Sequence, residues 1–145
     1  MGRLAHASSF KDPLVYQKAF GVARQVFEVT KSMPKEEVFF LTDQVRRSSR
    51  SIRAQIAEAW AKRRYHKQFV SKLTDADAEQ METQHWIDIA KDCGYLDSRT
   101  AEALSHELSE IGRMLNGMME KAHEFCGKDG LIARESDKEY FLGEA

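Results

Sequence analysis

The chain has 145 residues, of which 42% are hydrophobic, and its acidic and basic side chains nearly cancel to a net charge of −1. This length allows a single domain with a buried core, and no run of about 18 apolar residues is present to span a membrane. A near-neutral chain also excludes a surface that coats nucleic acid indiscriminately, although it allows a local basic patch.

The ends and the cysteines indicate the compartment. Residues 1–11 (MGRLAHASSFK) lack the apolar segment of a secretion signal and predict a flexible lead in a cytoplasmic protein. Cys93 and Cys126 form no CxxC motif, so we expect a reducing compartment and no disulfide bond. We expect Cys93, next to a helix end, to be a buried packing residue.

The first helix is predicted over 12–32. Asp12 can cap it, Pro13 suits a first helical position, and the following apolar residues recur at helical spacing. Gly21 lies inside this helix, where it either permits a close approach or costs about 1 kcal/mol relative to alanine. Pro34 ends the element, because the residue before a proline avoids the α region.

Residues 35–40 are predicted to be a connector, in which Val38 to Leu41 form an apolar plug. Thr42 is the expected N-cap of a second helix, which carries most of the positive charge of the chain. Residues 46 to 67 contain eight Lys or Arg against one acid, Glu58, so the rest of the chain carries about −8. Those eight are Arg46, Arg47, Arg50, Arg53, Lys62, Arg63, Arg64 and Lys67.

These basic residues admit two interpretations. Guanidinium groups can grip the phosphates of an external nucleic acid, with Tyr65 and His66 able to stack on bases. Alternatively, the arginines pair with the acids of the third helix or of a neighbouring subunit. We favour the structural role for Arg46 and Arg47. The residues for which we favour an external anion are Arg53, Lys62, Arg63, Arg64 and Lys67.

Two further helices complete the fold. The third is predicted over 66–92, with Gly94 after its end, and the fourth begins after Asp97 or Ser98, which caps it. In the fourth, apolar residues from Ala101 to Phe125 alternate steps of three and four, as in a coiled coil. The residues we expect in core or subunit packing are Trp60, Trp86, Leu108, Leu115 and Met118, with Met114 and Met119 beside them.

The pattern predicts an all-α protein, an antiparallel up-down four-helix bundle over 12–126. The tail, 127–145, changes to mixed charge with two glycines, and we expect it to be disordered or to dock on a neighbouring subunit.

Two E-x-x-H motifs, Glu82–His85 and Glu120–His123, have the spacing of di-iron carboxylate bundles, with Glu28 and Glu58 as further candidate ligands. Such ligands must project into the bundle. Glu120 lies far around its helix from the apolar seam, so we expect surface residues and no metal or other cofactor.

Several segments resemble one bacterial family of four-helix bundles, the proteins encoded in intervening sequences of large-subunit ribosomal RNA genes. The resemblance covers roughly residues 10–122. The segments that carry it are Phe10-Lys11-Asp12, Val15 to Ala19, Leu41 to Arg47, Ser51-Ile52, Ile56-Ala57-Glu58, Glu82-Thr83-Gln84, Gly94-Tyr95-Leu96 and Arg113-Met114-Leu115.

The same bundle resembles the accessory protein of diversity-generating retroelements, a homopentameric barrel that binds nucleic acid and a reverse transcriptase. The resemblance therefore implies a ring-like homo-oligomer, a pentamer as in that relative, without catalytic activity. This chain departs from the family pattern at Arg53, where proline is usual, at Gln55, where asparagine is usual, and at Ala59-Trp60, where glycine precedes an aromatic residue.

Charge and resemblance together predict a non-enzymatic homo-oligomer whose second helix contacts nucleic acid, RNA rather than DNA. The alternative is a structural or protein-interaction scaffold in which the arginines form salt bridges within and between subunits. In that case a reverse transcriptase is one possible partner.

Overall fold

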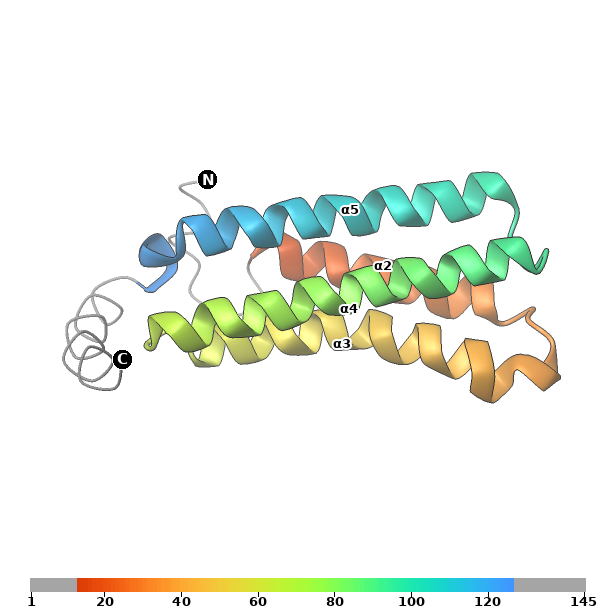
Figure 1. The fold of residues 1–145 in the computed structure, drawn as a ribbon, viewed down its shortest axis with the longest axis horizontal. Helices are drawn as coiled ribbons and strands as arrows, with labels where there is room; N and C mark the ends of the chain where they lie inside the picture. Colours follow the sequence, from red (N-terminus) through yellow and green to blue (C-terminus); the bar gives the residue numbers. More distant parts are fainter. Residues whose placement is uncertain (1–12, 127–145) are drawn as a thin grey trace.

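The computed structural model describes residues 13–126, which form an antiparallel up-down bundle of four long helices (Figure 1). This architecture confirms the all-α prediction. The helices are α2 (Leu14–Thr30), α3 (Asp43–Ala61), α4 (His66–Asp92) and α5 (Ser98–Glu120). Each packs against the next in the chain, and α2 closes the bundle against α5. The expectations for residues 1–12, including the Asp12 cap, and for the tail lie outside the described residues.

The start of α3 differs from the prediction. A 3₁₀ turn, η1 (Lys35–Glu37), and a π-helical turn, η2 (Val38–Thr42), run directly into α3, so the chain is already helical before Thr42. Thr42 has helical dihedral angles and makes no side-chain cap. Its hydroxyl instead donates to the sulfur of Met33 at 3.7 Å. The predicted N-cap is therefore wrong, because a π turn already supplies the preceding helical backbone.

The predicted apolar plug is also wrong. Leu41 is buried in the core, but Phe39 and Phe40 are 72% and 73% exposed and Val38 is 36% exposed. Because residues 38–42 are helical, their side chains point in different directions around the helix, and Leu41 is the apolar side chain of this turn that faces the core.

The turn between α4 and α5 follows the prediction. Gly94 has φ of +80°, and the amide of Tyr95 donates to the carbonyl of Ala90 at 2.9 Å, which closes α4. The Asp97 carboxylate accepts from the Thr100 amide at 2.7 Å and caps α5. Tyr95 also donates from its hydroxyl to Glu37 at 2.9 Å, which ties this turn to η1.

The core combines an apolar seam with a polar layer. Trp60, Leu108, Leu115 and Met118 are buried, whereas Trp86, Met114 and Met119 are partly buried against the core. On α4, Gln80 and Thr83 are buried, while the apolar Met81 is 58% exposed. α4 packs between α3 and α5 (Figure 1). The Thr83 hydroxyl donates to that of Ser48 on α3, and the Gln84 side-chain amide donates to the Ser109 hydroxyl on α5.

None of the described helices is both long enough and apolar enough to cross a membrane.

Candidate nucleic-acid interface

Three of the predicted basic residues lie on α3 against the aromatic side chains of α2. The guanidinium carbons of Arg46 and Arg50 lie 4.7 Å and 5.8 Å from the centroid of the Phe27 ring. Arg46 is also fixed by hydrogen bonds, since its Nε donates to the Thr30 hydroxyl at 2.7 Å and its Nη2 to the Phe27 carbonyl at 3.5 Å. Arg46 is therefore held in place by α2, whereas its predicted structural role called for an acid of the third helix or of a neighbouring subunit, and within residues 13–126 it pairs with no carboxylate.

Phe20 makes the second aromatic contact. The guanidinium carbon of Arg53 lies 4.1 Å from the Phe20 centroid, and that of Arg24 lies 5.3 Å from it. Seven residues separate Phe20 from Phe27 on α2, and seven separate Arg46 from Arg53 on the antiparallel α3. This shared spacing of about two helical turns brings the two sets into register.

These contacts define a surface that we call the arginine–phenyl strip. Its cations come from both α2 and α3, and the α2 members were not identified from the sequence. Lys31, the residue directly after α2, lies with its Nζ 4.9 Å from the Phe27 centroid and also pairs with Glu28 at 3.2 Å. The strip consists of Phe20, Arg24, Phe27, Lys31, Arg46, Arg50 and Arg53.

The strip has few acidic neighbours. Within residues 13–126, Arg24, Arg46, Arg50 and Arg53 form no salt bridge. An open hollow of about 480 Å³ on the same side of α3 is lined by Asp43, Arg46, Arg47, Arg50, Ser51 and Ala54. Of its three arginines, Arg46 and Arg50 have no carboxylate partner within residues 13–126, whereas Arg47 does. This arrangement favours an anion.

Arg47 differs from the other arginines because α4 supplies its counterions. It pairs with Glu82, and its Nη1 lies 3.5 Å from Glu79. Burial raises the pKa of Glu79, and the nearby Arg47 offsets this rise only in part. Glu82 also accepts from the indole of Trp86 at 3.0 Å. Arg47 thus joins α3 to α4.

The basic residues after α3 have separate environments. Arg63 stacks on Trp60, with its guanidinium carbon 4.5 Å from the centroid of the ring, and its Nη1 donates to the Trp60 carbonyl at 3.0 Å. It therefore covers the end of α3. Within residues 13–126, Lys62 and Arg64 make no side-chain hydrogen bond or salt bridge, and both are exposed. Lys67 is exposed in the first turn of α4.

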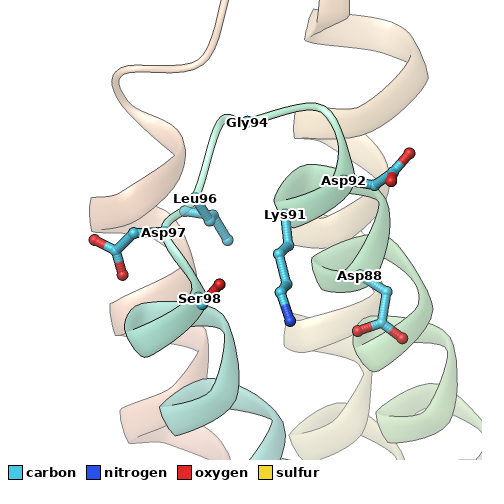
Figure 2. A pocket seen from close by; sticks show the side chains of 7 residues that line it. All are labelled: Asp88, Lys91, Asp92, Gly94, Leu96, Asp97 and Ser98. Atoms are coloured by element: carbon cyan, nitrogen blue, oxygen red, sulfur yellow. The ribbon is translucent and has the colours of Figure 1, made fainter.

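A second hollow, of about 730 Å³, lies at the α4–α5 turn (Figure 2). Three aspartates and one lysine provide its charged groups, so its net charge is unfavourable for phosphate. Its lining residues are Asp88, Lys91, Asp92, Gly94, Leu96, Asp97 and Ser98.

The E-x-x-H residues do not assemble. The Glu82 carboxylate already pairs with Arg47 and accepts a hydrogen bond from Trp86, and His85, Glu120 and His123 are exposed. In the described part of the chain, no group of three or more His, Cys, Asp or Glu could hold a metal ion. Cys93 is exposed, which corrects its predicted burial, because it lies at the C-cap of α4 where the chain leaves the core; Cys126 is buried.

Comparison with known proteins agrees with this architecture. Residues 11–117 match the family described as 23S rRNA-intervening sequence protein. A crystal structure of a protein of unknown function from the S23 ribosomal protein family of Bacteroides thetaiotaomicron VPI-5482 is similar, with a TM-score of 0.64 and 24% identity over 72% of this chain and 97% of that chain. At this identity the likeness establishes the fold alone. No curated protein matches the sequence.

Proposed function

The chain belongs to the 23S rRNA-intervening sequence protein family, and from this premise we propose that it is a non-enzymatic, self-assembling protein whose helix α3 binds RNA. The observation that carries the proposal is the setting of Arg46, Arg50 and Arg53. Their guanidinium groups lie against phenyl rings, and within residues 13–126 they have no carboxylate partner. The family name supports ribosomal RNA as the class of ligand, and a cytoplasmic location follows from that ligand.

The chemistry of the guanidinium group explains why stacking prepares such a site. A cation–π contact uses the face of the guanidinium, whereas its N–H donors point outward in the plane. Those donors match the paired oxygens of a phosphate. Bringing several cations together also costs electrostatic energy in the free protein, and a bound polyanion relieves that cost.

Self-assembly is the second part of the proposal. A homopentamer follows from the resemblance to the retroelement accessory protein, and in such a ring several copies of the strip would act on one RNA. Avidity would then raise affinity without new contacts within each subunit. A reverse transcriptase is a possible protein partner on the same basis.

A structural scaffold is the competing function, and Arg47 is the residue that favours it. Its pairing with Glu79 and Glu82 is the use of arginine that this alternative requires. In a scaffold, the remaining arginines would pair with carboxylates of neighbouring copies.

A gel-shift titration with structured RNA over a series of salt concentrations tests the proposal, together with native mass measurement. Contact with about five phosphates gives a slope of log K against log[salt] between about −3.5 and −4.5. Replacing Arg50, Arg53 and Arg64 with glutamine should weaken binding and flatten the slope without changing the oligomer mass.

The control is Arg113→Gln, which removes one positive charge from an exposed position on α5, where Arg113 pairs with Glu110 at 2.8 Å; its one-charge counterparts are the single glutamine variants of Arg50, Arg53 and Arg64. This variant should bind as the wild type does. Undetectable binding at low salt would remove RNA binding from consideration, and a triple variant that becomes monomeric would support the scaffold.

A further inference from the structure

Two phenylalanines are the most exposed large apolar side chains in the described chain. Phe39 is 72% and Phe40 is 73% exposed, on the π turn at the end of the bundle where α2 connects to α3 (Figure 1). Two hydrogen bonds order the turn: the Asp43 backbone amide donates to the Val38 carbonyl, and the Gln44 side-chain amide donates to the Phe39 carbonyl at 3.5 Å. The rings are therefore presented on helical backbone.

The two rings lie about two to three helical turns before the arginines of the hollow on the same helical path. Because η2 runs directly into α3, Phe39 lies about one turn before Asp43 and two turns before Arg46 and Arg47. At a rise of about 1.5 Å per residue, Phe40 is about 9 Å along the axis from Arg46 and about 15 Å from Arg50. The aromatic pair thus precedes the arginine-lined hollow on one continuous helix.

The size and surroundings of the pair indicate its occupant. Two phenyl rings at this exposure offer roughly 300 Å² of apolar surface, well below the ~800 Å² that each partner buries in a standard protein interface. Their own turn, η2, carries no charged side chain, but the α3 helix that continues it carries Arg46, Arg47, Arg50 and Arg53, which suits an anionic chain. An unpaired nucleotide offers both a flat apolar base and a phosphate, and bases stack on such rings in single-stranded RNA complexes.

We propose that Phe39 and Phe40 form a stacking platform for unpaired bases of an RNA whose phosphates follow the arginine–phenyl strip. This inference rests on the proposed RNA binding and specifies its ligand as single-stranded. In a duplex the bases are stacked and paired with one another, so the rings cannot reach their faces.

Fluorescence anisotropy with oligouridylate and with an RNA duplex of equal length tests this. The wild type should prefer oligouridylate, whose bases are unstacked. The double variant Phe39→Leu/Phe40→Leu keeps apolar side chains but removes the π faces. We expect it to bind oligouridylate roughly 5- to 150-fold more weakly, with unchanged affinity for the duplex. Phe39→Tyr/Phe40→Tyr retains the π faces and should restore the preference.

Met81→Leu is the control for a change at an exposed apolar side chain, since Met81 is 58% exposed on α4 and should not affect either ligand. Full affinity of the leucine double variant for oligouridylate, or an equal loss for both ligands, would overturn the stacking platform and leave RNA binding intact. If the wild type binds neither RNA at low salt, the proposed function itself fails. A lower native mass of the leucine variant would assign the rings to contacts between copies and would also overturn the platform.

Discussion

The guanidinium carbon of Arg53 lies 4.1 Å from the centroid of the Phe20 ring, closer than any other arginine of the strip lies to its ring. The contact crosses from α3 to α2, so the orientation of the side chain depends on the packing of these two helices. At an exposed site such a contact contributes about 0.5–1 kcal/mol. Its main effect is to hold the N–H donors of Arg53 ready for a ligand.

Substitutions of Arg53 separate charge from geometry. Arg53→Gln should weaken RNA binding and reduce the salt slope by about 1, because one phosphate contact is lost. Arg53→Lys keeps the charge but cannot form the bidentate fork, so we expect a similar slope with weaker affinity. Gel shifts of both variants at several salt concentrations measure the two effects. Identical slopes for the wild type and Arg53→Gln would contradict a phosphate contact.

Arg47→Gln provides a contrast on the same helix. Arg47 is already paired with Glu79 and Glu82, so its loss should leave the salt slope of RNA binding almost unchanged. The urea midpoint of unfolding should fall, because two carboxylates of α4 lose their counterion. A slope reduced as much as in Arg53→Gln would show that Arg47 also contacts the ligand.

The sequence predicts the bundle well because α5 and α3 have clear apolar faces. It predicts α4 less well because residue type and spacing disagree there. The buried positions of α4 alternate steps of four and three, but Gln80 and Thr83 occupy two of them, while the apolar Met81 lies outside the register. Buried polar residues that hydrogen-bond to one another are invisible to a pattern based on hydrophobicity alone.

The candidate interface was only partly predictable. Charge counting identifies the basic residues of α3, but it cannot distinguish Arg47, which pairs with α4, from Arg50, which lies against Phe27. The aromatic supports on α2 are missed because Phe20 and Phe27 have the spacing of core residues. Their partial exposure depends on how α2 is rotated against α3, which is a tertiary property.

Replacing a helix glycine with alanine should have opposite effects on stability at Gly21 and at Gly112. A Cβ added at Gly21 meets no atom within 4 Å, so Gly21→Ala should raise the free energy of unfolding by about 0.5–1 kcal/mol through helix propensity. At Gly112 the same Cβ would lie 2.8 Å from Nε2 of Gln80, a buried side chain held by Asp77 and Gln84. Gly112→Ala should therefore destabilise. Urea denaturation measures both, and equal effects would contradict the close approach of α4 and α5 at Gly112.

The buried Ser48 and Thr83 hydroxyls form a 2.8 Å hydrogen bond between α3 and α4. Thr83→Val removes one partner, and we expect a loss of about 1–3 kcal/mol because a buried polar group loses a partner. The double variant with Ser48→Ala should be less destabilised than the sum of the single variants, since the hydrogen bond that the two hydroxyls share is then lost once and not counted twice. A double-mutant cycle by urea denaturation measures this coupling, and strict additivity would contradict it.

Glu79 predicts a pH-dependent stability. Burial raises its pKa above 4.5, so the folded state binds this proton more tightly than the unfolded state. The stability that the protonated Glu79 carboxyl contributes is fully present below its pKa in the unfolded state, and it is lost as the pH rises through its pKa in the folded state. Glu79→Gln mimics the protonated form. The variant should match the wild type at acid pH and have a higher urea midpoint at pH 7.

Asp97 is a control, because its pKa is shifted in the opposite direction and its effect on stability should therefore have the opposite pH dependence. The hydrogen bond from the Thr100 amide lowers its pKa below 3.8, so its contribution is present at neutral pH and is lost as the pH falls through the folded pKa. Asp97→Ala should therefore be less stable than the wild type at pH 7, and the difference should narrow in acid. Urea midpoints measured from acid to neutral pH should diverge in opposite directions for the two variants. If the difference in urea midpoint between Glu79→Gln and the wild type stayed constant across that range, the pKa of the Glu79 carboxyl would not be raised. The effect of the substitution on stability would then come from packing and not from the charge.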